Sequence, residues 1–288
     1  MFDNFNLIPG EAFKALDNIS NNLINKVAAA TGYMFIPHGR RKDKEEAIDY
    51  LIDEIKNNDK MPLYLKAASI SNARRLLKKY SNQQDILYES MKYLDDNARP
   101  ESLDDDWLVN FMEKAGNISN KDIQSIYAKI LAEEASKPGM ISRNLINTIA
   151  VMDHELADAF RRLSKAIVYL QGDNGEEPEI VLPIHEEKGK YHQIISFMDL
   201  VNLTSIGLVE YAVSFGSAYI WDVKEATVRY GDERFILRSQ NNKIPIGDVN
   251  LTRSGIELSK IIVSEVDATY LSQIKEFWRE RGIEIINQ

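Results

Sequence analysis

Apolar residues recur at steps of three and four between Glu11 and Ile36, which predicts an amphipathic helix near the start of the chain. Its opposite face is rich in asparagine, and Lys26 is the only charged residue from Asn18 to Pro37. Such a stripe suits packing against the same domain or a second subunit, and it also suits a membrane surface. Both alternatives stay open at this point. The stripe consists of Phe13, Leu16, Ile19, Leu23, Val27, Ala30 and Met34.

Pro37 and Gly39 are expected to end this helix, and the cations Arg40 and Arg41 follow it directly. A basic cluster behind a low-charge amphipathic segment could meet lipid phosphates or nucleic acid. Acidic residues dilute the cluster from Asp43 onward, which favours a solvated helix start. The asparagines disfavour a span through the bilayer.

Helical spacing continues from Lys44 to Leu170 and predicts a series of further helices. One of them follows Pro62 and is expected to end with Arg74, Arg75, Lys78 and Lys79, where cations complement the helix dipole. A separate helix is expected from Gln84. Predicted helix caps are Asp104 to Asp106, Ser119, Ser142 and Asp153, and the last of these opens a helix reaching Ile167.

The composition changes at Gly172, where glycine, acids and Pro178 predict a linker. Strand-like runs rich in valine, isoleucine and tyrosine follow, and two helices are expected to finish the chain. The fold class is therefore α+β, with a mostly helical amino-terminal domain and a smaller mixed α/β carboxy-terminal domain. The predicted regions are an amphipathic helix over 1–37, a helical domain over 38–171 and an α+β domain over 179–288.

The carboxy-terminal domain has the element order of a winged helix, in which a helix leads through a glycine into strands. The helix is expected over Ser196–Leu203, Gly207 follows it, and Thr252 or Ser254 opens a closing helix. A helix that reads DNA needs a basic surface, but Ser196–Leu203 contains no Lys or Arg and includes Asp199. Contact with protein therefore fits this region better than contact with DNA.

Composition narrows the chemistry. The 288 residues carry 35 Lys+Arg against 44 Asp+Glu, a net charge of −9, and no Cys, which excludes thiolate nucleophiles and zinc-thiolate sites. A chain without Cys suits a reducing cytosol, so a cytoplasmic protein is expected. The amphipathic first helix adds the expectation that the protein can associate with a membrane. The histidines form no metal-ligand pair, and no phosphate-binding or nucleophile motif occurs. No catalytic, cofactor or metal site is therefore predicted.

The acidic run Asp104–Asp106 leaves one alternative open. Several carboxylates in a row can bind a divalent cation, but the alternating spacing of an EF-hand loop is missing. Acids ahead of Trp107 also suit the start of a helix, and this interpretation is preferred.

Several motifs together resemble an uncharacterised bacterial family, domain of unknown function 2806, and the related abortive-infection-alpha proteins. The motif residues are Arg99, Pro100, Asp104, Asp105, Asp106, Trp107, Tyr127, Lys129, Leu131, Pro138 and Gly139. Tyr127 stands where the family usually has Trp, Glu133 where it has Gly, and Met140-Ile141 departs from Ser-Phe. No catalytic residues are established for the family, so these departures put no known chemistry in doubt. The resemblance implies a bacterial or prophage protein of anti-phage defence.

The leading hypothesis is a non-enzymatic defence protein that acts through assembly, as a homo-oligomer or with a partner protein, and through contact with the inner-membrane surface. Nucleic acid is a less favoured partner. The alternative is a DNA-binding regulator that uses the winged region. A hydrolase or nuclease that uses the acidic clusters is a third, weaker possibility.

Overall fold

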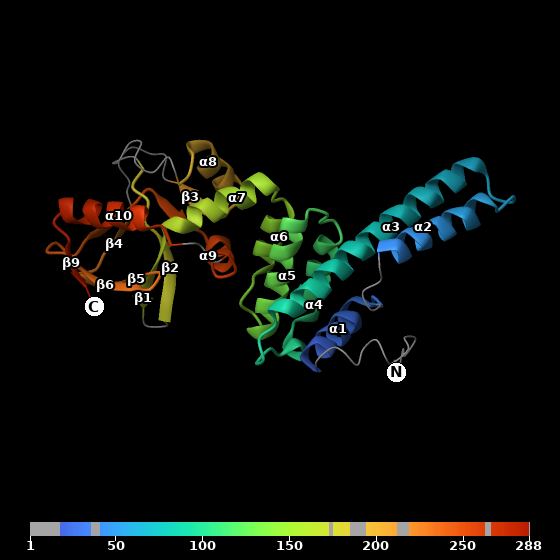
Figure 1. Cartoon of the computed structure of the whole chain (residues 1–288), viewed down its shortest axis with the longest axis horizontal. Coiled ribbons are helices and arrows are strands. Elements are labelled where there is room, and N and C mark those ends of the chain that lie inside the picture. Colours follow the sequence, from blue (N-terminus) through green and yellow to red (C-terminus); the bar gives the residue numbers. More distant parts are fainter. Residues whose placement is uncertain are drawn as a thin grey trace. The chain divides into compact units, whose positions relative to one another are not determined.

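The computed structural model describes residues 18–35, 41–172, 175–184, 194–211, 219–262 and 266–287, without the side chains of 41–45 and 172. The chain divides into two compact units, Met1–Ala150 and Val151–Gln288 (Figure 1). Unit 1 is helical, and unit 2 combines helices with antiparallel sheets. The predicted α+β class is confirmed.

Unit 1 is built on α4 and α5, which bury apolar side chains against the second half of α3. Ile86, Leu108, Phe111, Tyr127 and Leu131 are completely buried in this core. The elements in order are α1 (Asn18–Thr31), α2 (Arg41–Lys56), α3 (Leu63–Ser90), η2 (Met91–Tyr93), η3 (Pro100–Ser102), α4 (Asp105–Ala115), α5 (Lys121–Ser136) and α6 (Arg143–Ala150).

Helix α1 ends at Thr31, earlier than predicted from Pro37 and Gly39. Gly32 has a φ of +71°, the left-handed conformation in which glycine commonly stops a helix, and its N–H donates to the Ala28 carbonyl at 2.9 Å. Met34 therefore lies outside the helix. The predicted stripe residues Phe13 and Leu16, and Arg40 beyond the helix, lie outside the described residues.

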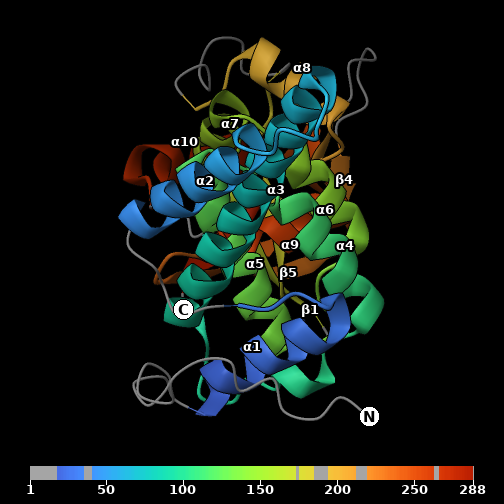
Figure 2. The same cartoon turned by 90° about the vertical axis from the view of Figure 1, so that its right-hand side faces the viewer.

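Helix α3 is continuous over Leu63–Ser90, so the predicted break before Gln84 is wrong. No glycine or proline interrupts this stretch, and Pro62 precedes its first residue. The cations from Arg74 to Lys79 consequently lie in the middle of α3, and the predicted role at a helix end is wrong for them. Figure 2 shows α2 running alongside the first half of α3.

Unit 2 contains a five-stranded antiparallel sheet in the order β2-β1-β5-β6-β9. Helix α10 buries Tyr270, Ile274 and Trp278, and the Trp278 ring lies 6.0 Å from that of Phe235 on β6. The elements in order are α7 (His154–Leu163), η4 (Ser164–Ala166), β1 (Ile167–Gly172), β2 (Gly175–Ile180), α8 (Phe197–Ser205), β3 (Val209–Tyr211), β4 (Tyr219–Trp221), β5 (Glu225–Tyr230), β6 (Glu233–Arg238), β7 (Ile244–Gly247), β8 (Val249–Leu251), α9 (Arg253–Ser259), α10 (Ala268–Glu280) and β9 (Glu284–Asn287).

The predicted linker at Gly172–Pro178 is wrong, because Gly172 belongs to strand β1 and residues 175–178 belong to strand β2. The register of the two strands runs from Ile167 opposite Ile180 to Gly172 opposite Gly175. Ile167 thus begins a strand and does not close a helix. Pro178 is tolerated because β2 is an edge strand, where one backbone donor can be missing without breaking a ladder on both sides.

Around the predicted winged region, α8 begins with a capping box in which Ser196 and Asp199 exchange side-chain to backbone hydrogen bonds. Strand β3 pairs with β8, and Thr252 then caps α9 by accepting from the Gly255 N–H at 3.1 Å. Of the two predicted starts of this helix, Thr252 and Ser254, the structure shows Thr252 as the cap. A winged-helix fold for the whole region stays a prediction.

Candidate functional site

The acidic run of the family motif forms the start of α4. Asp104 is its N-cap, and the Trp107 N–H donates to its Oδ1 at 2.7 Å, as predicted. This hydrogen bond is the main reason why the pKa of the Asp104 carboxyl is below its ordinary value, and Arg143, 3.2 Å away, lowers it further. The carboxylate therefore serves a helix end.

The two following acids form ion pairs. Asp105 lies 2.7 Å from Lys26 of α1, and Asp106 lies 3.7 Å from Arg143 of α6. In the part of the chain that the structure describes, no group of three or more His, Cys, Asp or Glu side chains could hold a metal ion. The three acids therefore connect the start of α4 with α1 and α6, and we call this region the corner.

Three aromatic rings extend from this corner into the core of unit 1. Trp107 stacks on Phe111 at 5.1 Å between ring centroids, and Phe111 lies 5.2 Å from Tyr127. The Trp107 indole N–H donates to the Ile141 carbonyl at 2.8 Å, and the Tyr127 hydroxyl donates to the Ile146 carbonyl at 3.0 Å. Burial raises the pKa of Tyr127, which keeps this donor protonated. The rings therefore tie α4 and α5 to the segment of α6.

A buried carboxylate that the sequence analysis missed closes the Pro138-Gly139 turn. Glu134 is 2% exposed and accepts from the N–H groups of Gly139 at 2.6 Å and Ile141 at 2.7 Å. Gly139 has a φ of +86°, which suits glycine. The sequence offered one signal for this role. Glu134 follows Ile130 by four residues, which places the acid on the apolar face of α5.

The remaining motif residues also serve packing or connection. The Arg99 N–H donates to the Ala135 carbonyl at 2.7 Å, Pro100 is buried as the first residue of η3, and Leu131 is fully buried. Lys129 lies 5.5 Å from the centre of the Tyr93 ring. The motif residues thus hold unit 1 together.

The predicted apolar stripe of α1 is partly buried and partly exposed in the structure. Leu23 and Val27 are 0% exposed, since α1 packs on α4 and η3. Ile19 is partly buried, whereas Met34 is 50% exposed beyond the helix end. The middle of the stripe is therefore covered within unit 1. The side chain of Arg41, the first residue of α2, lies outside the described residues.

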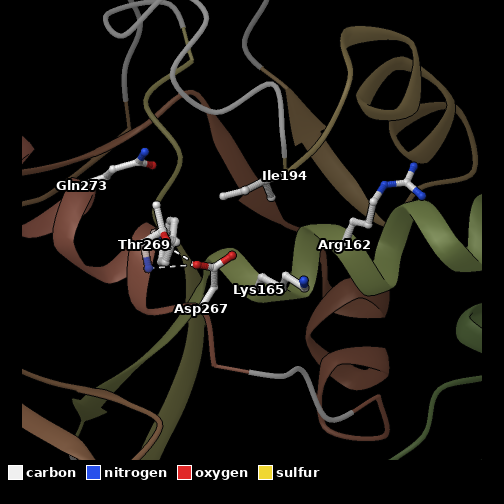
Figure 3. A pocket seen from close by; sticks show the side chains of 7 residues that line it. Arg162, Lys165, Ile194, Asp267, Thr269 and Gln273 are labelled. Atoms are coloured by element: carbon white, nitrogen blue, oxygen red, sulfur yellow. Dashed lines mark hydrogen bonds between the residues drawn. The ribbon is translucent and has the colours of Figure 1, made fainter.

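Unit 2 has a small polar pocket of about 180 Å³ (Figure 3). Two of its charged groups already have structural partners. Arg162 pairs with Asp199 at 2.9 Å, and Asp267 caps α10 by accepting from the Thr269 N–H at 2.9 Å. Lys165 and Gln273 complete the polar lining. The Asp267 carboxylate also accepts from the Tyr270 N–H at 3.1 Å, so its hydrogen bonds serve the start of α10.

Of the histidines, His154 lies 3.3 Å from Asp158 in the same helix, and His38, His185 and His192 lie outside the described residues. No described helix is long and apolar enough to cross a membrane.

The most unusual surface lies on the helical hairpin formed by α2 and α3, which we call the arm (Figures 1 and 2). At its turn, Leu63 is 84%, Tyr64 87% and Leu65 51% exposed. We call these three residues the arm tip. Farther along α3 lie Arg74, Arg75, Lys78 and Lys79, which we call the basic row. Large apolar side chains and cations thus share the exposed part of α3, and sequence reasoning did not identify this as a site.

The fold and this surface define the class of the protein. It is an α+β protein with a helical unit 1 and an arm that exposes apolar and basic side chains. The family model for protein of unknown function DUF2806 matches residues 71–275, so the chain belongs to that family. The match covers the motif corner, the basic row and most of unit 2, and it begins after the arm tip. No curated protein and no solved structure matches the chain.

Proposed function

We propose that this chain is a bacterial anti-phage protein of the abortive-infection type that acts by assembly and surface contact, without catalysing a reaction. The observation that carries the proposal is the arm tip, because monomeric proteins seldom leave large apolar side chains exposed together without a binding role. The motif acids support it, since they cap α4 and form ion pairs across unit 1.

The link to defence rests on the resemblance to abortive-infection-alpha proteins, and the assembly rests on the exposed arm. In this proposal, copies of the chain or a partner protein cover part of the arm, and the inner-membrane surface is a further contact. The buried face of α1 is not needed for this contact, because Leu23 and Val27 are already used inside unit 1.

Plaque counting tests the proposal. The chain is expressed in a phage-sensitive host and challenged with a broad panel of phages, beside a variant carrying Leu63→Ser and Leu65→Ser. A matched control carries Val109→Ser and Val151→Ser, which change exposed valines away from the arm. We expect protection by the wild type and the control, and its loss in the arm variant. Absence of protection against the whole panel would contradict the defence proposal.

The second candidate function is nucleic-acid binding, and the basic row is the observation that favours it. The predicted DNA-reading helix, α8, instead exposes Phe197 and Met198 and carries Asp199. Binding through the basic row would weaken as salt screens the phosphate contacts. A flat gel-shift titration with duplex DNA at low salt removes this candidate.

A further inference from the structure

The arm extends beyond the core of unit 1, and its two helices pack on each other. Helix α2 contacts α3, and Ile52 of α2 is 5% exposed while Tyr50 on the same helix is 65% exposed. The second half of α3 packs on α5, so the exposed part of α3 is its first half. Figure 2 shows the two arm helices side by side. The arm can therefore meet a surface without unfolding the core.

The two helices of the arm differ in charge, since α2 carries six acids and four cations whereas the first part of α3 is basic. Residues 60–84 contain six cations and no acid, in a protein with a net charge of −9. Among the described residues, none of these six forms an ion pair with an acid. A local group of unpaired cations attracts an anionic surface although the protein as a whole is acidic. The six cations are Lys60, Lys66, Arg74, Arg75, Lys78 and Lys79.

Helical spacing places aromatic, small and basic residues on one exposed line of α3. Steps of four, three, four and three residues connect Tyr64, Ala68, Ser71, Arg75 and Lys78, and all five are exposed. The line is about 21 Å long at 1.5 Å per residue. Ala68 and Ser71 are small, so the helix can approach a flat surface closely along its middle. Leu63 and Leu65 flank the line at its start.

From these observations we infer that the exposed line of α3 docks on the surface of an anionic phospholipid bilayer. The helix lies along the surface, with the leucines and the ring of Tyr64 in the interfacial layer and Arg75 and Lys78 against lipid phosphates. Tyrosine suits this layer because its ring is apolar and its hydroxyl stays hydrated. The inference deepens the proposed contact function and rests on it for the biological purpose of the docking.

The combination of side chains decides between anionic partners. Nucleic acid would use the cations and could stack a base on Tyr64, but it gives no reason for Leu63 and Leu65 to be exposed beside them. A bilayer uses both kinds of side chain at once, since apolar burial and charge attraction add up at its interface. Lipid therefore explains the exposure of the arm tip as well as the absence of acids from residues 60–84.

Flotation of the full chain with vesicles tests the inference. One set of vesicles contains only phosphatidylcholine, and a second set contains phosphatidylglycerol in addition. We expect binding to the anionic set, weaker binding to the neutral set, and a decline of binding as salt is raised. Equal binding to both sets, or binding to neither, would overturn the inference.

Three variants locate the contact. Removing two cations by Arg75→Gln and Lys78→Gln should weaken anionic-vesicle binding about 25-fold, at about fivefold for each cation. Leu63→Ser with Leu65→Ser should weaken it at unchanged charge. The control, Lys92→Gln with Lys260→Gln, removes the same charge from exposed sites off the arm and should bind within about twofold of the wild type, because charges beyond a Debye length are screened.

The outcomes separate the proposals. Circular dichroism confirms first that each variant is folded. Binding to duplex DNA that falls with the two-cation variant but not with the leucine variant, without vesicle binding, would replace lipid by nucleic acid. Vesicle binding without protection in the plaque assay would keep the lipid inference and contradict the defence proposal. Equal vesicle binding by the two-cation variant and its control would overturn the inference.

Discussion

Helices α1 and α3 both carry apolar residues on a face free of acids. The face of α1 is buried within unit 1, whereas the face of α3 is exposed. Leu23 and Val27 of α1 are fully buried against α4 and η3, and Lys26 fixes the same contact through Asp105 at 2.7 Å. Leu63 of α3 is 84% exposed, because its half of the helix extends past the core. An apolar face can serve a partner only where the fold of the chain itself leaves it open.

The largest effect is expected when the buried face of α1 is cut back. Leu23→Ala should lower the free energy of unfolding of unit 1 by about 2–5 kcal/mol, because it removes a fully buried side chain and leaves a cavity. Urea denaturation measures the change. Leu76→Ala makes the same substitution at a 55% exposed position of α3 and should cost less than about 0.5 kcal/mol. Similar losses in both variants would remove the difference between the helices.

A smaller loss is expected at the Pro138-Gly139 turn that Glu134 closes. Glu134→Gln replaces a buried carboxylate that accepts two backbone N–H groups with an amide whose nitrogen cannot accept one of them. The free energy of unfolding should fall by about 1.5–3 kcal/mol. The control is Glu133→Gln, which breaks an exposed pair with Lys137 and should cost less than about 1 kcal/mol. Equal unfolding midpoints for both variants would contradict this role of Glu134.

The pH dependence of the N-cap of α4 gives a third prediction. The Asp104 carboxyl has a folded pKa below its unfolded value, so its cap stabilises α4 above about pH 4 and is lost as the pH falls through the folded pKa. Arg143→Gln removes one cause and should raise the pKa of Asp104 toward its ordinary value. NMR titration of the carboxyl carbon measures it, with Lys137→Gln as the control. An unchanged midpoint in Arg143→Gln would show that Arg143 does not act on this carboxylate.

The smallest effect is expected at the arm tip. Leu63→Ala with Leu65→Ala should change the free energy of unfolding of the isolated chain by less than about 0.5 kcal/mol, because both side chains already lie in solvent and alanine favours a helix. Thermal unfolding at low protein concentration measures this. A loss above about 1 kcal/mol would mean that the chain itself covers the tip.

Local rules predicted what depends on a few neighbouring residues. The caps Asp104 and Asp153 were predicted from a polar side chain ahead of an apolar stripe, and Thr252 was one of two predicted starts of the closing helix. All three accept a backbone N–H of the first turn. One cap was misplaced by a single residue, since Asn120 and not Ser119 caps α5.

Errors arose where distant residues decide the structure. Ile167 continues the helical spacing of α7, but pairing with Ile180 and the neighbouring strand β5 makes its segment a strand. The Glu-rich sequence before Pro178 looks like a linker because β2 lies at the edge of the sheet, where polar residues are tolerated. Leu23 is buried and Leu63 is exposed because of tertiary packing, which the helical spacing of the sequence does not predict.

Thiol labelling tests most directly the claim that α1 is closed and α3 open. The chain has no cysteine, so Leu23→Cys and Leu65→Cys each introduce one reporter. With a maleimide probe on the native chain, we predict that Leu65→Cys reacts nearly as fast as in urea, and that Leu23→Cys reacts slower by a factor on the order of 100 or more, because its thiol is exposed only by opening of the fold. Anionic vesicles should then slow the reaction of Leu65→Cys alone. Equal labelling rates at the two positions in the native chain would contradict the account.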